Sequence, residues 1–264
     1  MKFAKNQLWV CAACIAAALF HVTPVYAQEP PADGAYTEMY EGSSQVKEET
    51  QYARGEKSGP FRLYFPSGRL MAVGSYKEGK YHGPYKEYYE SGVLKIDQVY
   101  ANGSLEGVSK EFYDNENLKN EEKYKGNLLE GTCTYYFENG QPQYIFQYKD
   151  GDLNGTTKEF NAQGVLISEV MYKDDEINGT AKEFDEQGAL RVISTYVNGV
   201  KNGESKMFYE TGEVEWALNF KDDLPDGIVR RFTKEGRLDR ECRYSSGTEG
   251  DCKEFPAPAV TEGH

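Results

Sequence analysis

A 24-residue repeat constrains this chain more than any other feature of its sequence. An aromatic residue recurs every 24 residues, at Tyr52, Tyr76, Tyr100, Tyr124, Tyr148, Tyr172, Tyr196, Phe220 and Tyr244. A glycine follows seven residues later, at Gly59, Gly83, Gly107, Gly131, Gly155, Gly179, Gly203 and Gly227, and the last copy is one residue shorter, with Gly250. A second ring lies five residues after each glycine, at Tyr64, Tyr88, Phe112, Tyr136, Phe160, Phe184, Phe208, Phe232 and Phe255. Such a period is typical of an array in which each unit packs only against its neighbours.

Each unit is predicted to be a β-hairpin followed by a second turn. Strand-like segments such as Gly155–Phe160 lie between turn dipeptides, Asp150-Gly151 on one side and Asn139-Gly140 on the other. Both residues of such dipeptides adopt positive φ in tight hairpin turns, and a glycine every ten or so residues disfavours helices. We therefore expect an all-β fold, an elongated single-layer antiparallel sheet of successive 24-residue β-hairpin repeats. About 17 strands would give a body on the order of 80 Å long.

The repeat resembles a known family. The pattern Y-x-x-G-x-x-x-G-x-x-x-E-F-x-x-x-G-x-L, as in Tyr148 to Leu166, is similar to the MORN-repeat superfamily. It is most similar to the bacterial variant found in proteins named as YwqK-type antitoxins. The resemblance covers about residues 40–255, and it implies an elongated antiparallel sheet whose repeats act as scaffolds and binding surfaces.

The first 27 residues have the pattern of a secretory signal peptide. Lys2 and Lys5 form a positive start, the apolar run Leu8–Phe20 follows, and Ala27 ends a small-residue cleavage pattern. A retained N-terminal anchor is the alternative, although the apolar run is shorter than the about 20 residues of a membrane span. We expect an exported protein, periplasmic or extracellular in a bacterial envelope. Its predicted plan is a signal peptide at 1–27, a leader and partial repeat at 28–51, the repeat array at 52–255 and a flexible tail at 256–264.

The acidic composition argues against two classes of partner. The chain has 43 Asp and Glu against 30 Lys and Arg, which gives a net charge of −13. Nucleic-acid binding depends on neutralising phosphates, and anionic membrane surfaces attract clusters of basic residues. We therefore expect neither nucleic acid nor an anionic membrane surface as a partner.

The residue after the second ring is itself aromatic in four early copies, which suggests a binding strip. Adjacent strand residues point to opposite faces, so these rings are predicted to lie opposite the second ring, together with residues of the same parity such as Leu63. An exposed apolar strip marks an interaction site. The predicted partner-binding residues are Phe61, Phe65, Tyr85, Tyr89, Tyr113, Tyr135 and Phe137. The alternative is that the leading segment 36–50, or the twist of the sheet, covers this strip.

Acidic residues gather in the predicted turns, for example Asp174, Asp175 and Glu176. Carboxylates can bind Ca²⁺, which takes six to eight oxygen ligands, but no copy has the spacing of a recognised calcium loop. We interpret these residues as solvated turns that keep the protein soluble, and we expect no metal site.

Three cysteines follow the predicted signal peptide. Cys242 and Cys252 flank the final hairpin turn, where they either face each other as a disulfide or remain two free thiols. An exported compartment permits the disulfide. Cys133 lies several repeats away and is predicted to be a buried or free thiol.

The sequence shows no catalytic constellation. Beyond residue 27, histidine occurs at His82 and His264, and His82 occupies a predicted turn. A Ser-His-Asp triad needs a positioned histidine, a zinc site needs more ligands, and the glycines follow the hairpin period. We therefore expect no catalysis and no cofactor.

The leading functional hypothesis is an exported repeat scaffold that mediates protein–protein interaction. A glycan- or cell-wall-binding module is the first alternative, because stacked tyrosines suit sugar faces. The second alternative is an immunity or antitoxin protein that neutralises a basic toxin.

Overall fold

The computed structural model describes residues 29–257, which form one open antiparallel sheet. The predicted signal peptide, 1–27, and most of the predicted tail lie outside the described residues. The strands are β1 (Gly34–Met39), β2 (Val46–Ala53), β3 (Glu56–Lys57), β4 (Gly59–Tyr64), β5 (Leu70–Lys77), β6 (Lys80–Tyr81), β7 (Gly83–Tyr88), β8 (Leu94–Ala101), β9 (Ser104–Phe112), β10 (Leu118–Lys125), β11 (Leu128–Leu129), β12 (Gly131–Tyr136), β13 (Pro142–Lys149), β14 (Asp152–Leu153), β15 (Gly155–Phe160), β16 (Leu166–Lys173), β17 (Glu176–Phe184), β18 (Leu190–Val197), β19 (Val200–Phe208), β20 (Val214–Lys221), β21 (Leu224–Pro225), β22 (Gly227–Phe232), β23 (Leu238–Ser245) and β24 (Thr248–Glu254).

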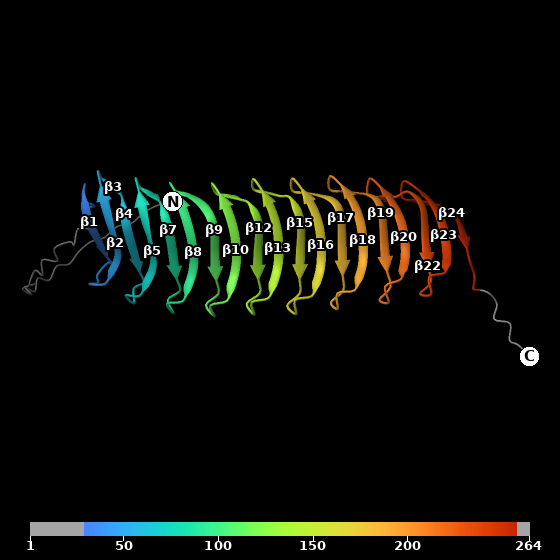
Figure 1. Cartoon of the computed structure of the whole chain (residues 1–264), viewed down its shortest axis with the longest axis horizontal. Helices are drawn as coiled ribbons and strands as arrows, with labels where there is room; N and C mark the ends of the chain where they lie inside the picture. The colour runs from blue at the N-terminus through green and yellow to red at the C-terminus, as the bar shows by residue number, and fades with distance from the viewer. Residues whose placement is uncertain (1–28, 258–264) are drawn as a thin grey trace, which may run out of the picture.

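The strands lie side by side in chain order, so the sheet is a long, twisted ribbon (Figure 1). Each strand pairs antiparallel with its neighbours along the chain, and the two-residue strands share a partner with the strand that follows them. The predicted all-β, single-layer antiparallel sheet of 24-residue repeats is confirmed. Within residues 29–257 there is no helix that is long and apolar enough to span a membrane.

Tight two-residue turns form the upper edge of the ribbon in Figure 1. Asp150 and Gly151 have φ angles of 52° and 99°, and Asn198 and Gly199 have 50° and 77°. These positive values at both positions are those of a type I′ turn, as the dipeptides predict.

The turns at the lower edge differ from this prediction. Gly140 has a φ of 84°, but Asn139 does not adopt positive φ. The Phe137 carbonyl accepts from the Gly140 N–H at 2.8 Å, and the Phe137 N–H donates to the Gln141 carbonyl at 2.8 Å. The loop is therefore longer than two residues, and only its glycine needs the left-handed conformation, as in hairpin loops built around a type I turn.

The glycine of the 24-residue period lies in a β-bulge rather than in a turn. Tyr148 pairs with Leu153, whereas Tyr144 pairs with Glu159, so two extra residues lie between these pairs. Gly155, at a φ of 127°, occupies that position. His82 lies one residue before Gly83, at the position that Asn154 occupies in its repeat, and its N–H donates to the Ser75 carbonyl at 2.9 Å. The predicted turn position of His82 is therefore wrong, because the chain continues through a bulge in the same strand direction.

One side of the sheet, the packed face, holds the most buried side chains. Its centre is the position two residues after each bulge glycine, where Phe61 and Cys133 are 1% and 0% exposed. Rings of the first aromatic series and the residues paired with them cover this position. The Phe61 and Tyr76 ring centroids lie 4.7 Å apart, and those of Tyr76 and Tyr81 lie 4.9 Å apart. Side chains on one face thus supply the burial that a second layer would provide in a sandwich.

The opposite side, the charged face, carries pairs of opposite charge between neighbouring strands. Lys110 and Glu121 occupy opposing positions and their charged atoms lie 3.1 Å apart. Glu169 accepts a hydrogen bond from Lys182, which lowers the pKa of Glu169. The second aromatic series is on this side, since Tyr64 donates to Glu49 at 2.7 Å. Such exposed pairs contribute little stability each, and each pair brings opposite charges together on this face.

Candidate partner-binding surfaces

The structure divides the seven predicted partner-binding residues between two places. Phe61, Tyr85 and Tyr135 lie on the packed face, within β4, β7 and β12. Phe61 is 1% exposed and its ring packs against Tyr76 and Tyr81, so it offers almost no surface to a partner. Tyr85 and Tyr135 are partly exposed. Neighbouring rings on the same face therefore cover Phe61.

The other four rings, Phe65, Tyr89, Tyr113 and Phe137, lie at the lower edge, each immediately after the end of a strand. The Tyr89 hydroxyl donates to the Phe112 carbonyl at 2.8 Å, and the Tyr113 hydroxyl donates to the Tyr136 carbonyl at 2.9 Å. These tyrosines therefore connect one repeat to the next. Their partly exposed rings remain available at the edge, and their role in binding a partner stays a prediction.

A carboxylate lies between two rings at the middle of the packed face. Tyr124 donates to Glu122 Oε2 at 2.8 Å, and Tyr135 donates to Glu122 Oε1. Burial is the main cause that raises the pKa of both tyrosines, and these hydrogen bonds raise it further. Burial also raises the pKa of Cys133, which shares this part of the face. The side chains of Tyr124, Tyr135 and Cys133 are therefore neutral near pH 7 and pack together on this face.

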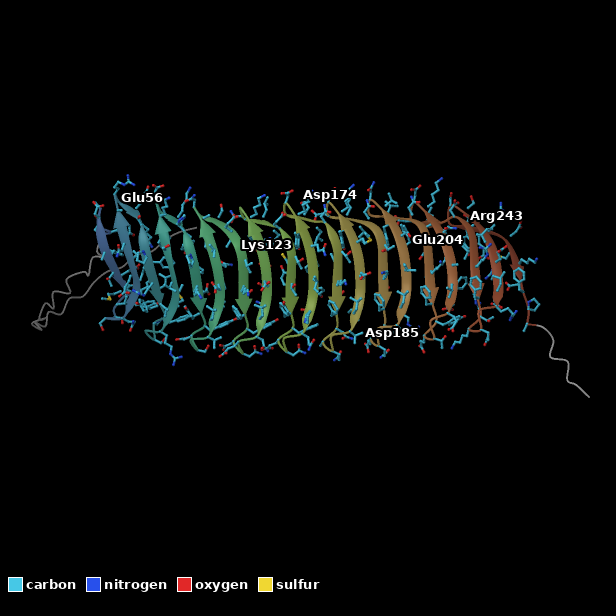
Figure 2. The ribbon with its side chains drawn as sticks, in the orientation of Figure 1. Glu56, Lys123, Asp174, Asp185, Glu204 and Arg243 are labelled. Atoms are coloured by element: carbon cyan, nitrogen blue, oxygen red, sulfur yellow. A yellow bond between two sulfur atoms is a disulfide. The ribbon has the colours of Figure 1, made fainter. Side chains whose placement is uncertain are left out.

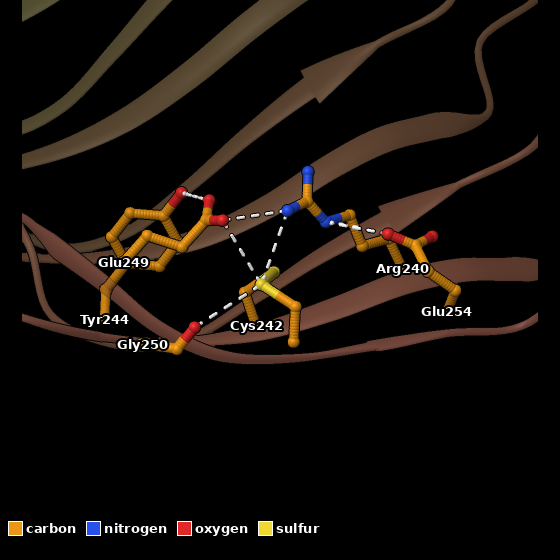
Figure 3. Close-up of a disulfide and its surroundings, with 7 residues drawn as sticks. Arg240, Cys242, Tyr244, Glu249, Gly250 and Glu254 are labelled. Carbon is orange, nitrogen blue, oxygen red and sulfur yellow. Dashed lines mark hydrogen bonds and ion pairs between the residues drawn. A yellow bond between two sulfur atoms is a disulfide. The ribbon is translucent and has the colours of Figure 1, made fainter.

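The last hairpin contains a disulfide between Cys242 and Cys252 (Figure 3). The two residues lie directly opposite each other on β23 and β24, with Cα atoms 4.1 Å apart. Cys133 is a buried free thiol. Within the described part of the chain, Cys242, Cys252 and Glu249 are also the group of three ligand-type residues whose ligand atoms lie within 4.8 Å of one another. The acidic turns of residues 29–257 form no group of that kind.

Negative charge is concentrated in the middle of the ribbon. Residues 102–189 contain 18 Asp and Glu against 8 Lys and Arg. Residues 29–101 contain 11 acids and 9 bases, and residues 190–257 contain 13 acids and 11 bases. The middle repeats therefore have a net charge of −10, whereas each end has −2.

Much of this middle charge lies along the two edges. Asp174 is at the upper edge and Asp185 at the lower edge (Figure 2). At the upper edge, the charge on Asp175 is the main cause that raises the pKa of Asp152 in the neighbouring turn. Asp175 also accepts a hydrogen bond from the Leu153 N–H at 2.7 Å, which links adjacent turns. The carboxylates of successive turns are thus close enough to repel each other, and the edge has a strongly negative potential.

Sequence reasoning missed the residues that pair with the first aromatic series and cover the packed face. Tyr81, Leu105, Leu129, Leu153 and Ile177 each lie opposite a ring of that series. Each also lies two residues before a repeat glycine, so a fixed spacing was available as a signal. Apolar residues at this position in five copies predict a second buried row.

Comparison with known proteins identifies the repeat. The family model described as MORN repeat variant matches residues 81–102, 105–125, 129–150, 153–174, 177–198 and 201–222. The chain belongs to the MORN repeat variant family. The six matched MORN units follow the structural period, from the residue before each bulge to the next tight turn.

Other comparisons add little to this assignment. No curated protein gives a significant match to the chain. One similar solved structure is the crystal structure of TcdB2-TccC3-Cdc42, at 12% identity and a TM-score of 0.20. The match covers 81% of this chain and 14% of that one, so the chain spans about a seventh of the length of that protein. A TM-score at this level carries no structural or functional argument.

Proposed function

We propose that this MORN-repeat protein is an exported, non-catalytic scaffold that binds a basic protein partner along its acidic middle repeats. One observation carries the proposal: the net charge of −10 on residues 102–189, between two nearly neutral ends. Complementary charge steers partners to each other and orients them on contact. A partner with a basic surface is therefore favoured at the middle of the ribbon.

The edges are better suited to this role than the faces. On the charged face, lysines pair with carboxylates across the strands, as in Lys110–Glu121 at 3.1 Å and Lys158–Glu169 at 3.7 Å. The packed face uses its side chains to bury Cys133 and Thr157. The turns instead present carboxylates to solvent, and their backbone is held by hydrogen bonds between repeats, such as that from the Asp175 N–H to the Leu153 carbonyl at 3.1 Å. A partner would thus meet a rigid row of negative charges.

The test is a crosslinking capture from a bacterial envelope fraction with the purified chain, followed by affinity measurement on the isolated partner. We expect a partner with a basic surface, crosslinks in residues 102–189, and an affinity that falls as salt is added. The variant Asp152→Asn/Asp174→Asn/Asp175→Asn should weaken binding several-fold. Asn preserves the turn, because Asn127 accepts from the Leu105 N–H at 2.7 Å as Asp175 does from Leu153.

The matched control is Asp222→Asn/Asp223→Asn, in the equivalent turn of the nearly neutral C-terminal third. Asp223 accepts from the Lys201 N–H at 2.7 Å, so the local geometry is the same. Binding to this control should equal that of the unchanged chain. Equal weakening by both variants, or binding that does not depend on salt, would contradict the proposal.

The same experiment separates the alternatives. If the partner is a single basic toxin whose activity the chain blocks, the protein acts in immunity. If a glycan array gives binding and the capture gives no protein, the glycan-binding module replaces the scaffold. Loss of binding in Tyr89→Ser/Tyr113→Ser, with the fold retained, would place the contact on the lower-edge rings.

A further inference from the structure

The C-terminal end of the sheet differs from the rest of the array. Within residues 29–257, β24 is the last strand and pairs only with β23, and all seven of its residues are exposed. Cys252 of β24 is bonded to Cys242 of β23, which is 4% exposed. The disulfide thus joins an exposed residue to a buried one at the end of the described sheet.

Charged groups surround this disulfide (Figure 3). Glu249 Oε1 lies 3.3 Å from Cys252 Sγ. Arg240 Nη2 lies 2.8 Å from the same Glu249 oxygen and 3.4 Å from Cys252 Sγ, and Arg240 Nε lies 3.1 Å from Glu254. Tyr244 donates to the other oxygen of Glu249. The positively charged guanidinium therefore contacts both the Glu249 carboxylate and the Cys252 sulfur.

We propose that reduction of this disulfide creates a site for a thiophilic divalent cation such as Zn²⁺, with Cys242, Cys252 and Glu249 as ligands. Reduction by a dithiol breaks the S–S bond. The dithiol supplies two electrons and two protons and becomes a disulfide itself, and the chain gains two thiols. Binding of the metal then displaces the two thiol protons to solvent. The end of the ribbon is closed by a covalent bond under oxidising conditions and by a metal under reducing ones.

The ligand set fits this class of metal. Zinc takes cysteine thiolates, histidine and carboxylate oxygens in four-coordinate sites, and three protein ligands leave one position for water. The three ligand atoms already lie within 4.8 Å of one another. The Tyr244 hydroxyl donates to the second oxygen of Glu249. Such hydrogen bonds orient the ligands of metal sites. When the metal displaces Arg240 from Glu249, Arg240 keeps its ion pair with a second carboxylate, Glu254.

The test uses the full chain, reduced with a water-soluble phosphine, and Co²⁺ as a spectroscopic probe followed by Zn²⁺ competition. We expect one equivalent of Co²⁺ to bind with thiolate-to-metal charge-transfer absorption, and Zn²⁺ to bleach that absorption. The oxidised chain should show no such absorption. Its presence in the oxidised chain, or its absence from the reduced chain, would overturn the proposal.

Two serine variants locate the site. Cys252→Ser should abolish the absorption, whereas Cys133→Ser should retain it, and serine already occupies the position equivalent to Cys133 at Ser109 and Ser205. Glu249→Gln should weaken Zn²⁺ binding by roughly tenfold or more. Circular dichroism confirms that each variant keeps the β fold. Unchanged affinity in Cys252→Ser or in Glu249→Gln would show that the metal binds elsewhere.

Discussion

Glu116 occupies the lower-edge turn position that other repeats fill with glycine, as in Gly92, Gly140 and Gly164. Its φ is 69°, in the left-handed region, where a side chain costs about 1–2 kcal/mol. Replacing Glu116 by glycine removes this cost. Glycine also increases the conformational entropy of the unfolded chain, which reduces the gain in stability by about 0.4–1 kcal/mol. We expect Glu116→Gly to raise the free energy of unfolding by about 0.5–1 kcal/mol, as measured by urea denaturation.

The control for this substitution is Glu138→Gly, which removes one negative charge from the same edge in the next repeat. Glu138 does not adopt positive φ, so glycine there gains nothing and should leave the protein equally or less stable. If both variants change stability in the same direction and by the same amount, charge rather than backbone conformation is the cause.

At the level of single residues, the sequence predicted positions that depend on local chemistry. The Asp150-Gly151 turn follows from the dipeptide itself, and the opposing positions of Cys242 and Cys252 follow from their places around the last turn. The face of Tyr89 could not be predicted in this way. The strand register shifts between Glu87 and Tyr88, and the chain then turns, so strict alternation ends before the ring.

At the level of the strands, the packed face depends on neutral tyrosines. Burial raises the pKa of Tyr124 and Tyr135, both of which donate to Glu122. In the unfolded chain these groups ionise near pH 10, whereas in the folded chain they stay protonated to higher pH. The unfolded state therefore releases protons first, and the stability present below about pH 10 is lost as the pH rises further.

We expect the free energy of unfolding to fall progressively as the pH rises above about 10, measured by urea denaturation in a pH series. Tyr135→Phe removes one ionising group, so its curve should be shallower by at most about 1.4 kcal/mol per pH unit. The same alkaline slope in both proteins would contradict this account.

The strands themselves were predictable because their period is fixed. The row of residues that lies opposite the first aromatic series was harder to predict from the sequence. The residues of this row vary from Tyr81 and Leu105 to Lys201, and their shared role is recognised only from their pairing with the ring opposite. The bulge inserts two residues, so the residue two before the glycine and the residue two after it lie on the same face, as simple alternation predicts. The varied residue types, not the alternation, are what made this row hard to recognise in the sequence.

At the level of the whole molecule, stability is distributed over many similar interfaces. Each repeat contacts its neighbours through the same backbone ladders, ring rows and turn-to-turn hydrogen bonds, such as those from the Gly151 N–H to the Leu129 carbonyl and from the Gly199 N–H to the Ile177 carbonyl. In such an array each unit adds its own interface, and no single unit closes a central core. The length of the ribbon is therefore adjustable in whole units.

This equivalence predicts that one complete unit can be removed. Deleting residues 156–179 joins Gly155 to Thr180, which preserves the Asn-Gly bulge and the 24-residue spacing from Tyr148 to the ring now at Tyr196. The shortened chain should fold with the same circular dichroism spectrum, a lower free energy of unfolding, and a maximum dimension smaller by about 10 Å in solution scattering. Deleting residues 156–167 instead removes half a unit, so the following segment would enter the neighbouring strand position in the wrong direction and lose its antiparallel pairing. That variant should fail to form the cooperative fold, and equal behaviour of the two deletions would show that the repeats are not interchangeable modules.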